Sequence, residues 1–484
     1  MSDLKDASTK TQPPSTDGEQ GFEDDHGSHN LHFAQRGADV DIGTVDEHID
    51  GFDAERMRAR SALTTAEEKK LMRRVDVRMM TLCSLIFLIK NLDSANISNA
   101  RIMNSGTSRN IMTQLHLTAD EYSLLTVLYY IPYIVFEAPS NLLLKRMRPS
   151  VWQARIIISW GIALLCHVPV KNKGGIYATR FLLGLFEAGM FPAVILQMTY
   201  WYRPDEMSIR LLYFFPPTAK WLTDKEKAFI QARLPPNAPR ADEMNFNLKE
   251  IVHDLKDSRL WLFTLIWAFF TVGTSGVSFF QPTVIANLGY TTIAQAQLLN
   301  LPVSILGIVI IAVSGYFADR SRHIPRPVYP LIIYAIVLIC YGVMVAYPSD
   351  GGVYAATLIG NAAATAFYPL MWPWRVQTTS HATGSAFSIG FVNSYGQIGG
   401  AIGPQIFRAK YAPRYRQSFT AAMACVAAGV VTTLLTWWVT RRTEKDTRKL
   451  KAARLEANKN GMTVLEDIVD HDLSGKSSDD GRRD

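Results

Sequence analysis

Apolar runs of about 20 residues recur through the middle of the chain, and a helix of that length crosses the ~30 Å hydrocarbon core of a bilayer. The run at 328–347 has no polar face at the helical period of 3.6 residues, which a surface helix of a soluble protein would show. The pattern therefore predicts an all-α membrane protein. The ten predicted spans cover residues 77–98, 121–142, 152–169, 178–201, 260–281, 297–318, 328–347, 353–373, 385–407 and 418–440.

Polar segments divide these runs into two groups and flank them at both ends. The first segment is rich in Asp, Glu, Ser and Gly and poor in large apolar residues, a composition typical of disorder. Its end, over 64–75, has an N-cap-like Thr, early Glu and later Lys and Arg, which predicts a short lead-in helix. The predicted parts are a disordered N-terminal tail over 1–75, a helical bundle over 76–202, a central loop over 203–259, a six-helix bundle over 260–440 and a C-terminal tail over 441–484.

Basic residues in the short loops predict the orientation of the spans. The loops at 145–155 and 320–326 are rich in Lys and Arg, which collect on the cytoplasmic side of membranes. Both tails are therefore expected in the cytosol, and a plasma-membrane location is expected for the protein. The loop at 408–416 is an exception, because its four basic residues would face outside.

Charge and cysteine content exclude several other classes of protein. The formal net charge of the 484 residues is +7, but the basic residues lie mostly in short loops beside apolar runs, so we expect no nucleic-acid partner. The four cysteines lie inside apolar runs without metal-ligand spacing, and no Walker loop or HExxH motif occurs. We therefore expect no metal, no cofactor and no enzymatic activity.

Ionisable residues inside apolar runs are candidates for function, because a charge in hydrocarbon is costly. Lys90 and Asp93 lie three residues apart on one face of the first predicted span, so they can approach each other. Glu137 lies in the second span and Glu187 in the fourth. Burial raises the pKa of a carboxyl group, which can then exchange a proton near neutral pH. Asp93, Glu137 and Glu187 are therefore proton-coupling candidates, and a structural ion pair is the alternative for each.

Polar side chains in the first, eighth and ninth spans are candidates for binding a substrate. The ninth span combines amide and aromatic side chains with many glycines, and small residues let helices approach closely. Helix packing is the alternative role for these positions. The substrate-binding candidates are Lys90, Asn361, Tyr368, Asn393, Tyr395 and Gln397.

Several motifs resemble those of known carriers. The stretch GYFADRSRHIPRP at 315–327 resembles the loop signature of the major facilitator superfamily, with Gly315, Asp319, Arg320 and Arg322 at the matching places. Five further segments, in order and spacing, resemble the fungal anion:cation symporter family, which includes allantoate, nicotinate, pantothenate and biotin permeases. They are NLDSANISNAR (91–101), FEAPSNLLLK (136–145), GLFEAGMFPA (184–193), WYRPDEMSIR (201–210) and NSYGQIGGAIGPQIF with YAPRY (393–415).

The resemblance implies a monomeric secondary active transporter with two helical bundles of six spans each. It implies a bound small-molecule substrate near the membrane midplane, moved together with a proton through a lipid bilayer. A small organic anion or a vitamin-like nutrient is the expected substrate. One departure concerns the first-span motif, in which Ser94 stands where the family has a basic residue, while Lys90 lies one turn earlier.

The two predicted bundles are unequal, with four spans before the central loop and six after it. The segment LLYFF looks like the start of a fifth span but is followed at once by PPTAKW. We infer that two spans, about 40–60 residues, are absent at the Phe215–Pro216 junction. A splice form or an exon missing from the gene model, a genuine ten-span carrier, an inactive variant and a non-transporting nutrient sensor are the alternatives.

Overall fold

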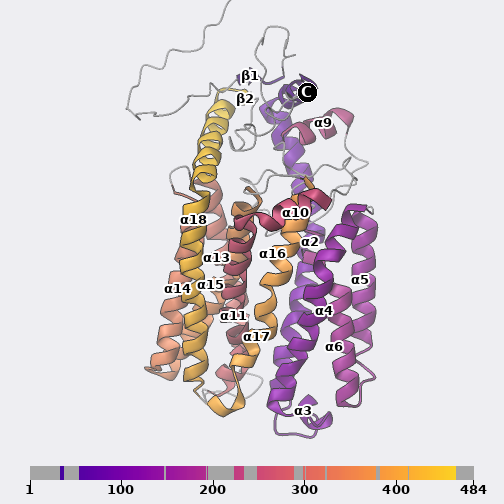
Figure 1. Cartoon of the computed structure of the whole chain (residues 1–484), viewed down its shortest axis with the longest axis vertical. Helices are drawn as coiled ribbons and strands as arrows, with labels where there is room; N and C mark the ends of the chain where they lie inside the picture. Colours follow the sequence, from indigo (N-terminus) through magenta and orange to yellow (C-terminus); the bar gives the residue numbers. More distant parts are fainter. Residues whose placement is uncertain are drawn as a thin grey trace, which may run out of the picture.

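The computed structural model is a bundle of long helices with a small two-stranded sheet at one end (Figure 1). It describes residues 33–37, 54–146, 149–191, 193–194, 223–233, 248–287, 298–299, 301–321, 324–377, 382–412 and 414–464. The prediction of an all-α fold is confirmed. The only described strands, β1 (Phe33–Gln35) and β2 (Met462–Val464), pair antiparallel.

The helices form two halves joined by a central segment. The N-half contains α1 (Ala54–Ser61), α2 (Thr65–Ile102), α3 (Ile111–Gln114), α4 (Ala119–Arg146), α5 (Pro149–Leu165) and α6 (Lys173–Glu187). The central segment contains α9 (Asp224–Arg233) and α10 (Leu248–Lys256). The C-half contains α11 (Ser258–Asn287), α13 (Leu301–Arg320), α14 (Val328–Ala346), α15 (Asp350–Gln377), α16 (Ala382–Gly396), α17 (Ile398–Ile406), η3 (Ala409–Tyr411) and α18 (Arg416–Lys459).

The bundle has two distinct ends. The sheet, α9 and α10 lie at the top in Figure 1, which we call the tail side, and α3 lies at the opposite end, which we call the far side. Helix α2 therefore runs from the tail side to the far side, and α4 returns. Each of the ten predicted spans falls at least in part on helix. Four of the described helices, α11, α13, α14 and α18, are long and apolar enough to cross a membrane.

The structure differs from the expected tails at both ends. Helix α1 and the first turns of α2 occupy 54–75, and α18 continues to Lys459 before β2. The lead-in helix is present, and Thr64 caps it in a capping box with Glu67. These segments are ordered because they bury side chains, among them Leu63, Leu71 and Val75. The junction at Phe215–Pro216 lies outside the described residues.

The ninth predicted span is broken at Gln397 into α16 and α17. A break frees backbone groups, which must find partners inside a membrane protein. The hydroxyl of Thr271 on α11 donates to the carbonyl of Gly396 and supplies one such partner. Close approach of α17 to α11 makes this contact possible. A Cβ at Gly399 would lie 2.1 Å from the backbone carbon of Thr271 and from the nitrogen of Val272.

Gly399→Ala should therefore destabilise the protein, because the new methyl group meets backbone that cannot rotate away. Overpacking of this kind costs about 1–3 kcal/mol or more. We expect a lower thermal unfolding midpoint in detergent and a larger aggregated fraction on gel filtration. The matched control is Gly342→Ala in α14, where an added Cβ has no neighbour within 4 Å. That control should be neutral or slightly stabilising, because Ala favours helix; equal losses in both variants would contradict the packing argument.

Candidate functional site

The two halves contact each other along α4, which packs against α16 and α17, and along α2, which packs against α11. Near the far side the amide of Gln405 on α17 donates to the carbonyl of Ser123 on α4 at 3.0 Å. Arg101 of α2 lies over the ring of Phe280 on α11, 4.4 Å from its centre. The halves are therefore in contact on the far side, and the contacts nearer the tail side involve the candidate residues.

Glu137 and Asn393 form the central polar contact between the halves. Both side chains are fully buried, and the amide nitrogen of Asn393 donates to the Glu137 carboxylate. Glu137 lies nine residues before the end of the 28-residue helix α4, in its tail-side half. The structure thus brings together one proton-coupling candidate and one substrate candidate that the sequence singled out separately.

A second polar group lies inside the N-half. Lys90 Nζ is 3.8 Å from a carboxylate oxygen of Glu187, and the hydroxyl of Tyr129 donates to the other oxygen at 2.7 Å. Asp93 instead accepts a hydrogen bond from the indole of Trp160 at 3.1 Å. Lys90 and Asp93 share a face of α2, as their spacing predicts, but each takes a partner from a different helix.

An aromatic cluster continues from Lys90 into the C-half. The Lys90 ammonium lies 5.8 Å from the ring centre of Phe191. The ring centres of Phe191 and Trp372 are 6.3 Å apart. The ring centres of Trp372 and Trp267 are 4.7 Å apart, and those of Trp267 and Tyr368 are 5.8 Å apart. The cluster joins a cation of the N-half to aromatic faces of the C-half, an arrangement suited to a ligand with a negative charge and a planar apolar part.

Trp267 and Trp372 were not predicted as site residues. Both side chains are fully buried, and within the part of the chain that the structure describes their indole N–H groups have no hydrogen-bond partner. A buried donor without a partner costs about 1–3 kcal/mol, so two such donors in the aromatic cluster mark a place where a ligand with acceptor groups would be stabilised. In the sequence these tryptophans are indistinguishable from core aromatics.

Arg180 was missed as well, although its signal was present in the sequence. It is a single cation inside the fourth apolar run, on α6. In the structure it lies within range of the charges of Asp93 and Glu187. The N-half interior therefore holds two cations, Lys90 and Arg180, opposite these two carboxylates.

Three other substrate candidates take no part in the Glu137–Asn393 contact. Asn361 donates to Gln281 at 2.6 Å and accepts from Ser278 at 3.1 Å, so its amide is engaged within the C-half. Tyr395 is 48% exposed and packs on Phe391. Gln397 lies at the break between α16 and α17.

The residues of the loop motif lie at the tail side. Gly315 and Asp319 belong to α13, and Asp319 lies 3.9 Å from Arg326 in an ion pair. Arg320 donates to the hydroxyl of Tyr316 at 3.0 Å. Arg322 lies outside the described residues. The motif thus ties the end of α13 to the turn that precedes α14.

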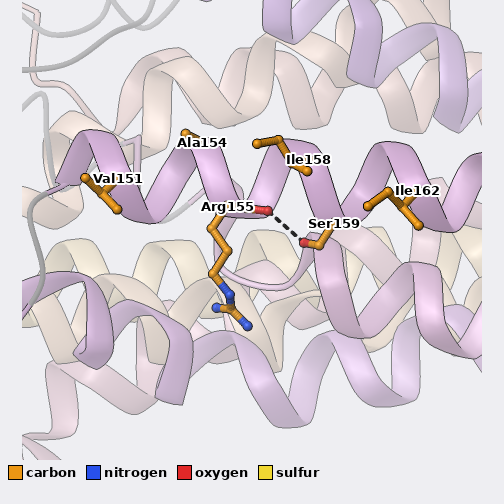
Figure 2. Close-up of a pocket in the computed structure, with 6 residues that line it drawn as sticks. All are labelled: Val151, Ala154, Arg155, Ile158, Ser159 and Ile162. Atoms are coloured by element: carbon orange, nitrogen blue, oxygen red, sulfur yellow. Dashed lines mark hydrogen bonds between the residues drawn. The ribbon is translucent and has the colours of Figure 1, made fainter.

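A shallow hollow on the outer face of α5 is lined by one helix alone (Figure 2). The hydroxyl of Ser159 donates to the carbonyl of Arg155 at 2.9 Å, so this polar group is satisfied within the helix. Ile158 and Ile162 are more than half exposed. A mostly apolar face whose exposed Arg155 lies over the ring of Trp152 suits lipid or a neighbouring helix, and we do not assign it to substrate. The lining residues are Val151, Ala154, Arg155, Ile158, Ser159 and Ile162.

Comparison with known proteins gives a consistent picture. The family model described as Major Facilitator Superfamily matches residues 95–214 and 207–404. The chain is similar to MFS transporter prlL of a fungal species (strain NRRL 50135), with 26% identity over 80% of this chain and 90% of that protein. It is also similar to the high-affinity nicotinic acid transporter of Saccharomyces cerevisiae, with 22% identity over 79% of each chain.

The alignment with prlL leaves part of that protein without a counterpart. It runs over 458 positions but takes in 80% of the 484-residue chain, or about 387 residues. About 70 positions therefore fall opposite gaps in this chain. The family match itself divides at 207–214, beside the Phe215–Pro216 junction.

The fold is similar to that of a solved carrier. A crystal structure of the Escherichia coli fucose:proton symporter FucP superposes with a TM-score of 0.50 and 12% identity, over 73% of this chain and 97% of FucP. Together with the family match over more than half of the chain, the helical fold shows an integral membrane protein. The chain belongs to the Major Facilitator Superfamily and is a secondary transporter.

Proposed function

We propose that the protein takes up a small organic anion together with a proton across the plasma membrane, with both tails in the cytosol. The observation that carries this proposal is the buried Glu137–Asn393 contact, because it places a titratable group where the two halves meet. Alternating access requires the halves to separate at this place when the tail side opens.

Glu137 is the proposed proton carrier. In its ionised form it accepts hydrogen bonds from Asn393 in the other half, and a charge-assisted hydrogen bond is stronger than a neutral one. Protonation removes the charge and weakens this link, which lowers the cost of separating the halves. Asp93 and Glu187 remain candidates for a second proton site, although each has a partner within the N-half.

The proposed substrate site lies between Lys90 and the aromatic side chains of Phe191, Trp372 and Trp267. Lys90 would attract the negative charge, and the two indole N–H groups would donate to it. The yeast relative is named for nicotinic acid, a planar ring with a carboxylate, which makes nicotinic acid the first compound to test. Tyr368 would line the same space, while Asn361, Tyr395 and Gln397 stay secondary candidates.

We also propose that two spans are absent from this 484-residue form at the Phe215–Pro216 junction. The gaps of about 70 positions against prlL are enough for two helices of about 20 residues and their loops. An even number of missing spans leaves the later helices in their original orientation. Such a form would lack part of the wall of the N-half, which makes an inactive variant the second candidate for this chain.

Transcript sequencing tests the junction directly. We expect reads from the gene to carry an in-frame insert between the codons of Phe215 and Pro216 that encodes two apolar runs. Reads that cross the junction without an insert in every transcript would contradict the proposal of an exon missing from the gene model and would favour a ten-span carrier.

Glu137→Gln should abolish uptake driven by an acid-outside gradient, because the amide cannot release a proton. The assay is nicotinic acid uptake in yeast that lacks its own transporter, with the two spans restored. Exchange of labelled for unlabelled nicotinic acid needs no net proton movement and should persist. The matched control is Glu121→Gln on the same helix, a surface ion pair with Lys173 that contributes little. Undiminished gradient-driven uptake by Glu137→Gln would refute the assigned role.

Lys90→Met should weaken binding of nicotinic acid about 10-fold or more, as expected for the loss of a charged hydrogen-bond donor worth about 1.5–3 kcal/mol. Binding of radiolabelled compound to purified protein provides the measurement. Lys173→Met, on the far side, is the matched control and should bind normally. Equal affinities for Lys90→Met and the unmodified protein would remove Lys90 from the substrate site.

A further inference from the structure

Three segments that lie far apart in the sequence meet on the tail side of the bundle. Strand β1 precedes α1, strand β2 follows α18, and the two pair with Ala34 opposite Thr463. Helix α9 of the central segment packs against α1. Figure 1 shows this group of elements above the ends of α18 and α2. The group therefore lies over both halves rather than over one of them.

Arg60 is the centre of this group. Its side chain is 1% exposed, which is unusual for a residue in a segment of tail-like composition. The guanidinium donates to the carbonyl of Ala232 in α9 at 2.9 Å and to the carbonyl of Val464 in β2 at 3.4 Å. A single side chain of α1 thereby binds both the central segment and the end of the C-half.

Arg36 adds a second link between the same parts. Its backbone nitrogen donates to the carbonyl of Gly461 at 3.1 Å, and its guanidinium donates to the carbonyl of Met462 at 3.1 Å. The guanidinium also forms an ion pair with Glu68 at the start of α2. Residues 33–37, Arg60 and 461–464 form a continuous connection, which we call the clasp.

The clasp closes the same side of the protein as the Glu137–Asn393 contact. Its N-terminal part is anchored on α2 of the N-half, and its C-terminal part is the direct continuation of α18 of the C-half. Ala34, Thr463 and Val464 are all buried, so the strands cannot slide apart without exposing these residues and their hydrogen bonds. Any motion that separates the tail-side ends of α2 and α18 strains the clasp.

We propose that the clasp is a brake on the transport cycle, which must open each time the carrier opens on the tail side, with Arg60 as its positioning residue. The proposal rests on alternating access by this carrier. The brake stabilises the arrangement closed on the tail side, so loosening it favours opening and fixing it prevents opening.

A reversible cross-link tests the clasp without knowledge of the substrate. Cysteines introduced at Ala34 and Thr463 would face each other in an antiparallel pair, whose Cα separation of about 4.5–5.5 Å suits a disulfide. Opening is read with Asn141→Cys on α4, since Asn141 is fully buried and its side chain would lie 3.1 Å from a Cβ on Gly390 of α16. Maleimide labelling at position 141, followed by peptide mass spectrometry of the purified full-length protein, measures how often the tail side opens.

We expect the disulfide to slow labelling of the Asn141→Cys reporter at least fivefold and a reductant to restore it. The single variants Ala34→Cys and Thr463→Cys, each with the reporter, should label at the normal rate in both conditions. If Asn141→Cys does not fold, Ala138→Cys on the same face of α4 is the second reporter. Equal labelling rates with the disulfide formed and reduced would overturn the proposal.

Arg60→Ala should have the opposite effect and speed labelling of the reporter at least threefold. The matched control is Arg58→Ala, an exposed arginine on the same helix, which should leave the rate unchanged. A rate unchanged in Arg60→Ala would show that the clasp does not resist opening. Labelling of the reporter does not require transport, so the two proposals can fail separately. If the labelling rate changes as expected in a protein that takes up no substrate, the proposed function is refuted and the clasp is supported.

Discussion

Every polar side chain inside the bundle needs a partner within the protein, because lipid offers no hydrogen bonds in exchange. Some of these groups find partners in their own half, as Asn361 does with Gln281 and Asp93 with Trp160. Glu137 differs, because Asn393 belongs to the other half. Separating the halves therefore breaks the pairing of a buried titratable group. The same requirement that holds the closed form together makes its stability depend on whether Glu137 carries a proton.

The helices were predictable from the sequence because the length of an apolar run is a local property of the chain. The partners of the polar side chains inside these helices were not predictable in the same way. Glu137 and Asn393 were each candidates, but 256 residues separate them and no local pattern links them. The spacing allowed Lys90 to approach Asp93 on the same helix face, and Lys90 pairs with Glu187 of α6. Spacing gives the direction in which a side chain leaves its helix and does not identify the helix opposite.

Charged residues outside the spans gave the least reliable predictions. Arg60 resembles a solvated charge in a disordered tail, and only the nearby carbonyls of α9 and β2 explain its burial. In the loop at 408–416, Arg414 lies 5.0 Å from the ring centre of Tyr347, and Lys410 lies 4.8 Å from that of Tyr411. Aromatic faces thus stabilise cations at the end where the distribution of Lys and Arg would disfavour them.

The proposed gap at Phe215–Pro216 lies outside the helices that carry the proposed site. Lys90, Glu137 and Glu187 lie on α2, α4 and α6, and the aromatic and amide groups opposite them lie on α11, α15 and α16. All of these helices precede or follow the junction. Two absent spans would therefore remove no residue from the proposed site, but they would remove part of the packing of the N-half. A short form would fail by losing the packing that positions the N-half, while keeping the groups proposed to exchange the proton.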